Sequence, residues 1–258
     1  MANRLLKNLT DYFGLRRHLQ DPWKFVWSRK TAEADNNPEI KFKAGFTVRC
    51  AVPHVDRQTL NGIFGRDEYR LNGFAHGSLD TVVDIGANIG LFSIRVAPLA
   101  KRVVAVEPLP DHFRILQSNL SPFRNVVPVQ KALSGKSGPL DLWVSPNPGG
   151  HSILRDVAKG STSIRVEAVT FREIFADHSI ERCDLLKIDC EGAEYESLAA
   201  MPDELWPRIR RIHMEFHQGP PGWSGEKLAE LLRGRGYRCD VVSRGHHQDQ
   251  GHLFAVRS

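Results

Sequence analysis

The chain has 258 residues and a mass of 29.1 kDa, which suits one large α/β domain with an extension or two small domains. Its formal net charge of +5 and pI near 9.1 permit anionic partners without requiring them. The four cysteines include no C-x-x-C pair and no zinc-site spacing, and no stretch approaches the ~20 apolar residues of a membrane-spanning helix. Because the first residues also lack the apolar core of a signal peptide, we expect a cytoplasmic protein with free thiols.

Residues 4–27 begin with an amphipathic pattern. Leu5, Leu9 and Phe13 fall at helical spacing among basic residues, and an aromatic cluster follows from Trp23 to Trp27. One interpretation is a helix docked on the rest of the protein, which we favour because the apolar stripe is narrow. The alternative is a weak contact of this segment with a membrane surface, since such helices pair Lys and Arg with Trp, Phe and Leu.

A small hairpin and a helix are expected next. Apolar residues alternate on both sides of Gly45, which predicts two short strands between Ile40 and Cys50. Helical spacing then predicts a helix over Asp56–Tyr69. We assign residues 1–55 to an N-terminal helical and hairpin extension and residues 56–258 to the main domain.

The main domain opens on a buried strand that turns tightly into a helix. The β-branched run Thr81–Ile85 is followed by Gly86, and a second apolar strand, Arg102–Val106, ends in Glu107. The interval from the turn to this acid is about the ~20 residues expected when the acid binds ribose hydroxyls. The two features predict an adenosine site at the switch point of a doubly wound sheet.

The glycines of the turn indicate which adenosine compound is bound. A dinucleotide fingerprint requires three glycines, but Asn88 stands at its second position and Leu91 at its third. An asparagine there would crowd a pyrophosphate, whereas S-adenosylmethionine carries no phosphate. We therefore favour a class I methyltransferase over a nicotinamide enzyme or a turn without a ligand. The predicted cofactor-binding residues are Asp84, Gly86, Asn88 and Gly90 for the amino-acid end of S-adenosylmethionine and Glu107 for its ribose.

The rest of the chain continues to alternate strands and helices. An added hairpin is expected between the third and fourth strands, from Leu140–Val144 and Ile164–Val169. The other predicted strands are Asn125–Lys131, Asp184–Asp189, Arg210–His217, Tyr237–Val242 and Leu253–Val256, and the helices between them are Pro108–Asn119, Thr170–Ala176, a helix ending near Ala200, and Glu226–Arg233.

Three motifs resemble the FkbM-type methyltransferase family. They are Val83–Gly90, Val106–Pro108 and, most specifically, Leu186–Glu194, which contains the pattern Lys-Ile-Asp-x-Glu-Gly-Ala-Glu. The resemblance spans roughly Asp56 to the C-terminus, with Cys190 where the family more often has valine. It implies a Rossmann-like class I methyltransferase with a seven-stranded sheet ordered 3-2-1-4-5-7-6. It also implies S-adenosylmethionine-dependent O-methylation, often of sugar hydroxyls on glycans or natural products.

Candidate catalytic residues come from the ends of the fourth and fifth strands. A hydroxyl nucleophile must lose its proton to a nearby base, and Asp189, Glu191 and His217 are the predicted candidates. The carboxylates could instead stabilise a helix start, and the histidine could be a plain surface residue. Glu215 fits either a structural acid or a base. These residues also offer ligands for a divalent cation, but without known geometry we predict no metal.

The sequence thus predicts an S-adenosylmethionine-dependent O-methyltransferase that acts on a hydroxyl of a small-molecule or glycan acceptor. An RNA methyltransferase is the first alternative, prompted by the basic pI, but the chain has no dense basic and aromatic track, so we expect no nucleic-acid partner. A non-catalytic S-adenosylmethionine-binding module is the second alternative.

Overall fold

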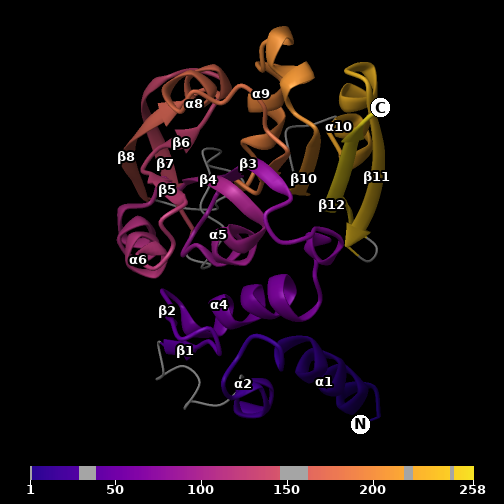
Figure 1. Cartoon of the computed structure of the whole chain (residues 1–258). Helices are drawn as coiled ribbons and strands as arrows, with labels where there is room; N and C mark the ends of the chain where they lie inside the picture. Colours follow the sequence, from indigo (N-terminus) through magenta and orange to yellow (C-terminus); the bar gives the residue numbers. More distant parts are fainter. Residues whose placement is uncertain (1, 29–38, 146–161, 218–222, 245–246) are drawn as a thin grey trace.

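The computed structural model describes residues 2–28, 39–145, 162–217, 223–244 and 247–258. Figure 1 shows a sheet with helices around it and, at one end of the molecule, a smaller group made of α1, α2, β1, β2 and α4. Within the described residues, no helix is long and apolar enough to cross a membrane.

A seven-stranded sheet forms the main part of the protein. Its order is β5-β4-β3-β9-β10-β12-β11, in which β12 runs antiparallel to both of its neighbours and the other pairs are parallel. In chain order this is 3-2-1-4-5-7-6, so the predicted order is confirmed. The strands are β3 (Leu79–Ile85), β4 (Ala100–Val106), β5 (Val126–Val129), β9 (Leu185–Ile188), β10 (Arg211–Phe216), β11 (Tyr237–Arg244) and β12 (His247–Arg257).

Helices cover both faces of this sheet because its central strands are apolar on both sides. Val82 joins one buried cluster with α5 (Leu91–Val96) and α6 (Pro110–Leu120), whereas the next residue, Val83, joins a second cluster on the other face. The helices of the second face are α8 (Phe171–Asp177), α9 (Glu194–Ala199) and α10 (Gly225–Gly234). Short helical turns lie at η2 (Leu71–Gly73), η3 (Ala97–Leu99) and η4 (Asp203–Arg208).

The predicted hairpins are both present. β1 (Glu39–Lys41) pairs antiparallel with β2 (Thr47–Arg49), and β7 (Gly138–Val144) pairs antiparallel with β8 (Thr162–Val169). A two-residue strand that the sequence did not indicate, β6 (Ala132–Leu133), adds to β8 in parallel, so the second hairpin is part of a separate three-stranded sheet.

The helix predicted over Asp56–Tyr69 begins and ends earlier than expected. It consists of α4 (Pro53–Leu60) and a π-helical turn, η1 (Asn61–Gly65). Beyond Gly65 the chain turns sharply, with Asp67 and Arg70 in the left-handed region at φ of 56° and 53°. Two left-handed residues three apart are incompatible with a continuing right-handed helix.

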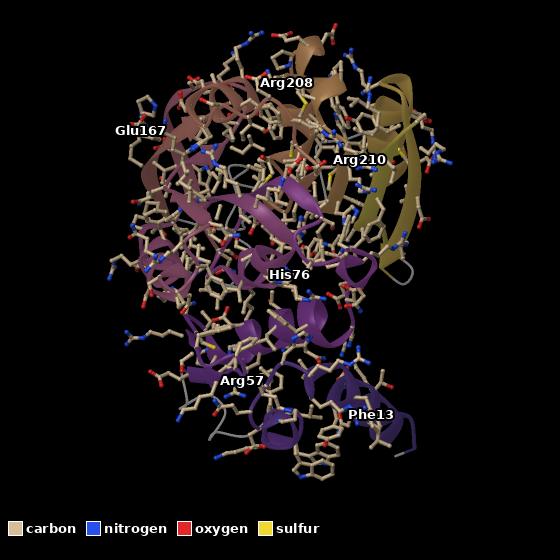
Figure 2. The ribbon with its side chains drawn as sticks, in the orientation of Figure 1. Phe13, Arg57, His76, Glu167, Arg208 and Arg210 are labelled. Atoms are coloured by element: carbon tan, nitrogen blue, oxygen red, sulfur yellow. The ribbon has the colours of Figure 1, made fainter. Side chains whose placement is uncertain are left out.

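The N-terminal helix α1 (Ala2–Leu15) docks on η1, and α2 (Pro22–Ser28) packs against α1, but Leu9 and Phe13 of the expected stripe are not on the docked side. The side chain of Leu5, the third residue of that stripe, lies outside the described residues. Leu9 and Phe13 are exposed, while Leu15 and Leu19 are buried in the same cluster as the sheet residues. A Cβ added to Gly14 would lie 2.0 Å from the carbonyl oxygen of Gly65, so this close helix contact requires glycine. The outward position of Phe13 at the end of the molecule is visible in Figure 2.

Candidate active site

The turn between β3 and α5 is built against the end of β9. Gly86 has a φ of 72°, and a Cβ at this position would lie 1.7 Å from the carbonyl oxygen of Asp189. Only glycine meets both conditions, the left-handed backbone and the close approach. The turn is therefore held next to the strand end that carries the candidate catalytic residues.

A buried lysine connects this turn to β9. The Lys187 ammonium donates hydrogen bonds to the carbonyl oxygens of Ile85, at 3.1 Å, and Gly86, at 2.8 Å. It also lies 3.2 Å from Asp84 Oδ1 and 3.5 Å from Asp189 Oδ2. Burial alone would lower the pKa of Lys187, but the two carboxylates outweigh burial and raise it. Lys187 is therefore charged, and it interacts both with the backbone carbonyls of the turn and with the carboxylates of Asp84 and Asp189.

The acid at the end of β4 is almost fully buried. Glu107 accepts hydrogen bonds from the backbone N–H groups of Asn88, at 2.8 Å, and Leu109, at 2.9 Å. Burial raises the pKa of Glu107 to about 7, although these two hydrogen bonds oppose the shift. Each carboxylate oxygen accepts one backbone bond and keeps a further lone pair for a ligand hydroxyl.

Asp189 is held by three neighbours. Besides Lys187, the Tyr69 hydroxyl donates a hydrogen bond to Asp189 Oδ2 at 3.3 Å, and His217 Nε2 lies 4.0 Å from Oδ1. Burial would raise the pKa of Asp189, but the charges of Lys187 and His217 lower it below its usual range. Asp189 is therefore an ionised hydrogen-bond acceptor at neutral pH.

His217 lies among carboxylates. Its Nδ1 contacts the fully buried Glu194 at 3.2 Å, and its Nε2 lies 3.5 Å from Glu191 Oε2 and 3.8 Å from Glu215 Oε1. Burial opposes the charge, but Glu194, Glu191 and Asp189 raise the pKa of His217 to about 10. Burial raises the pKa of Glu191 to about 8, against the attraction of His217.

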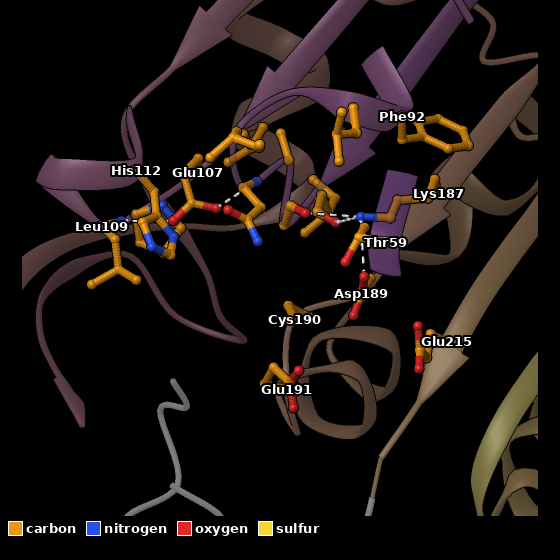
Figure 3. Close-up of a pocket in the computed structure, with 18 of the residues that line it drawn as sticks. Thr59, Phe92, Glu107, Leu109, His112, Lys187, Asp189, Cys190, Glu191 and Glu215 are labelled. Carbon is orange, nitrogen blue, oxygen red and sulfur yellow. Dashed lines mark hydrogen bonds and ion pairs between the residues drawn. The ribbon is translucent and has the colours of Figure 1, made fainter. Parts of the chain in front are cut away.

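These groups surround one cavity of about 570 Å³. Glu107 lies at one end of it beside Leu109 and His112, and Lys187, Asp189 and Glu215 lie at the other end (Figure 3). We call these the Glu107 end and the Asp189 end. The walls between them come from the β3–α5 turn and from α4 and η1, so segments distant in the sequence close the same site.

The structure brings together most of the predicted residues but not all. Gly86, Asn88, Glu107, Asp189, Glu191 and His217 line the cavity. Asp84 and Gly90 are not among the lining residues. Asp84 is fully buried, accepts a hydrogen bond from Ser93 Oγ at 2.7 Å and pairs with Lys187. Gly90, with a φ of 92°, starts α5 against Leu116.

Sequence reasoning did not single out Tyr69 or Glu194. Tyr69 precedes Asp189 by 120 residues and lies in a turn that was expected to be helical, so nothing in the sequence points to the contact. Glu194 belongs to the motif Lys-Ile-Asp-x-Glu-Gly-Ala-Glu, which was a signal of its importance. Its carboxylate accepts backbone hydrogen bonds from Cys190 and Gly192, and so fixes the turn that presents Glu191.

A metal ion is conceivable at the Asp189 end. Asp189, Glu215 and His217 each offer one ligand atom, and these atoms lie within 4.8 Å of one another. However, His217 can bind a metal only after it loses its proton, and the neighbouring carboxylates raise the pKa of His217 to about 10. The absence of a metal therefore stays our prediction.

The Glu107 end fits S-adenosylmethionine, the expected cofactor. Glu107 has free lone pairs for two ribose hydroxyls, and the glycine turn gives a ligand close access to backbone. Asn88 Oδ1 is buried beside the cavity and has no hydrogen-bond partner among the described residues, so a ligand donor would satisfy it. When bound, this cofactor supplies an electrophilic methyl group on a sulfonium.

Comparisons with known proteins agree with this fit. The family model described as the methyltransferase FkbM domain matches residues 84–239, more than half of the chain. The chain is 31% identical over 191 residues to the methyltransferase sdnD of Sordaria araneosa, covering 60% of this chain and 73% of that protein. It is 30% identical over 190 residues to the 31-O-demethyl-FK506 methyltransferase FkbM of Streptomyces tacrolimicus, covering 61% and 72%.

A third relative carries a sugar acid in its name. The chain is 26% identical over 202 residues to the hexuronic acid methyltransferase AglP of Haloferax volcanii, covering 75% of this chain and 80% of that protein. The extent of the family match and the two relatives at 30% identity or more lead to one conclusion: the chain belongs to the FkbM methyltransferase family and is an S-adenosylmethionine-dependent methyltransferase.

Proposed function

We propose that the protein transfers the methyl group of S-adenosylmethionine to a hydroxyl oxygen, and that the acceptor is a sugar or a similar polyol. The observation that carries the proposal is the single cavity that joins Glu107 to Asp189, Glu191 and His217. A methyl donor held at one end would face hydrogen-bond acceptors at the other. Methyl transfer is an in-line displacement, so this positioning would supply most of the catalysis.

The Asp189 end suits a hydroxylated acceptor. Asp189, Glu191 and Glu215 line it around His217, and carboxylates accept hydrogen bonds from hydroxyl groups. A sugar presents several hydroxyls on neighbouring carbons, which these acceptors can hold at once. The names of two relatives also support a hydroxylated acceptor. FkbM is named for a 31-O-demethyl substrate, and AglP is named for a hexuronic acid.

The same charges disfavour RNA as the acceptor. Nucleic-acid affinity comes mostly from Lys and Arg at phosphates, whereas the acceptor end of this cavity is lined by carboxylates. Arg66, a basic residue of the cavity wall, is already paired with the buried Asp11 at 3.0 Å.

Within this site we assign Glu191 as the group that accepts the hydroxyl proton. The pKa of Glu191 is about 8, whereas the neighbours of Asp189 lower the pKa of Asp189. Glu191 is therefore the stronger base of the two, and its pKa is the one nearer to neutral pH. Asp189 is assigned to orient the acceptor hydroxyl. His217 carries a proton at neutral pH, and its charge lowers the pKa of Asp189 and opposes the rise in the pKa of Glu191, so it is a positioning residue rather than the base.

The test is a methyl-transfer screen with labelled S-adenosylmethionine across neutral sugars, uronic acids, glycans, hydroxylated metabolites and RNA. Mass spectrometry and NMR of the product then identify the methylated atom. We expect label on an oxygen of a polyol. Label on a nitrogen or on RNA would refute the proposed acceptor, and cofactor binding without transfer to any acceptor would support a binding module instead.

A further inference from the structure

The outer side of α1 and α2 carries a cluster of exposed aromatic residues. Phe13 is 52% exposed, Trp23 54% and Trp27 36%, and Leu9 on the same helix as Phe13 is also exposed. We call these four residues the aromatic face. Isolated exposed apolar residues need no explanation, but a contiguous group of large ones marks an interaction surface.

The rings of the aromatic face are in contact with one another. Trp23 and Trp27 stack with their centroids 3.7 Å apart, and Tyr12 packs edge-on against Trp23 at 5.8 Å and against Phe13 at 5.5 Å. α1 and α2 therefore present one continuous apolar surface, in which Tyr12 connects Phe13 on α1 to Trp23 on α2.

Docking of the helices does not use this surface. α1 docks through Asp11, Gly14 and Leu15, and α2 buries Phe25 and Val26. The aromatic face points away from the remainder of the protein, as Phe13 shows in Figure 2. The aromatic face thus exposes large aromatic side chains to solvent, although they do not contribute to the docking of the helices.

Basic side chains surround the aromatic face. Lys7, Arg16, Arg17 and Lys24 are exposed on and next to α1 and α2, and the Arg16 guanidinium lies 4.9 Å from the centre of the Phe13 ring. Across residues 7–27, whose side chains the structure describes, Asp21 is the one exposed carboxylate. It accepts a hydrogen bond from the backbone N–H of Lys24, at the start of α2.

We propose that the aromatic face binds the surface of anionic membranes. Short helices with Trp, Phe and Leu on one side and Lys and Arg around them insert their apolar side chains at the headgroup boundary. Tryptophan and tyrosine rings prefer this boundary, because one end of the ring is apolar and the other can hydrogen-bond. The basic rim adds attraction to anionic headgroups, which favours a membrane over a second copy of this equally basic chain.

Membrane binding would place the active-site cavity near the lipid surface. On its inner side α1 holds Arg66 through Asp11, and Arg66 lines the cavity. One short helix thus separates the aromatic face from the cavity wall. This proposal does not depend on the nature of the acceptor, because binding can be measured without any methyl transfer.

Vesicle flotation of the full chain tests the proposal. Vesicles of phosphatidylglycerol and phosphatidylcholine are compared with vesicles of phosphatidylcholine alone. We expect flotation with the anionic vesicles, weakening as salt is raised. Replacing Phe13, Trp23 and Trp27 by serine should lower vesicle affinity by about tenfold or more. Replacing Arg17 and Lys24 by glutamine should lower it by about fivefold per charge.

Val242→Ser is the matched control, because Val242 is 44% exposed but lies on β11. It should float like the parent chain, and S-adenosylmethionine binding verifies that every variant is folded. Failure of the parent chain to float would overturn the proposal, and so would flotation that survives the triple serine change. A concentration-dependent dimer in solution that the triple change abolishes, without flotation, would show that the face binds a second copy instead.

Discussion

Lys187 shows how single residues connect the two ends of the site. Its ammonium donates hydrogen bonds to the carbonyl oxygens of Ile85 and Gly86 and lies beside Asp189, so the turn after β3 and the carboxylate after β9 are both positioned by one charge. Glu194 likewise connects two groups: its carboxylate contacts His217 Nδ1 and accepts a hydrogen bond from the backbone N–H of Gly192, in the turn that bears Glu191. Both residues act through others, and removal of either would leave buried partners unsatisfied.

At the residue scale we predict that cofactor binding depends on the ionisation of Glu107. Because burial raises its pKa to about 7, the carboxylate that accepts ribose hydroxyls is mostly formed only above that pH. Affinity for S-adenosylmethionine, measured by calorimetry, should therefore increase from about pH 6 to about pH 8. Glu107→Gln should weaken binding by roughly 10- to 100-fold and remove this pH dependence. An unchanged pH profile in the variant would contradict the assignment.

At the element scale, the turn between β3 and α5 depends on the position of β9. The backbone N–H of Asp189 donates to the carbonyl of Ile85 at 3.1 Å, and Gly86 leaves no space for a side chain beneath it. The two parallel strands thus end side by side, with the Gly86 turn after β3 and Asp189 and Glu191 after β9.

We predict that Gly86→Ala damages both parts of the site. The new methyl group would push against the Asp189 carbonyl as well as straining a left-handed backbone, so stability and cofactor affinity should both fall. Gly77→Ala is the control, because Gly77 has a φ of 66° with open space around it. It should cost only the ~1–2 kcal/mol of left-handed strain. Equal losses of stability in urea unfolding would show that the contact with Asp189 is unimportant.

The sequence predicted the elements with strong local signals. The strand order and both hairpins are confirmed, because buried parallel strands carry a clear pattern. Asp189, Glu191 and His217 line one cavity, and their catalytic roles stay predictions. The missed features depend on contacts between distant segments. Tyr69 reaches Asp189 only after a turn at Asp67 that no periodicity reveals.

At the scale of the whole molecule, the N-terminal helices share a core with the sheet. Leu15 and Leu19 belong to the same buried cluster as Val82 and Phe92, and the hairpin reaches α6 through Arg49 and Asn119. The division of the chain at residue 55 stays a prediction. Helical periodicity identified α1, but its docked face could not be chosen from the sequence because Leu9 and Leu15 are equally apolar.

We predict that Leu19→Ala lowers the free energy of unfolding of the whole protein by about 2–5 kcal/mol, because a fully buried leucine leaves a cavity. Leu9→Ala, at an exposed position of α1, should stay within ~0.5 kcal/mol. Urea unfolding followed by fluorescence and circular dichroism checks both values. A separate early transition for Leu19→Ala, with the main transition unchanged, would show that the extension is an independent unit.

The central claim is that cofactor and acceptor meet in one cavity and that Glu191 takes the acceptor proton there. The most direct measurement is the methyl-transfer rate of Glu191→Gln, alongside its affinity for S-adenosylmethionine. Because Glu191 lies at the Asp189 end, away from Glu107, affinity should change by less than about threefold while the rate falls by about 100-fold or more. A full rate in Glu191→Gln, or an equal loss of rate and cofactor affinity, would contradict the account.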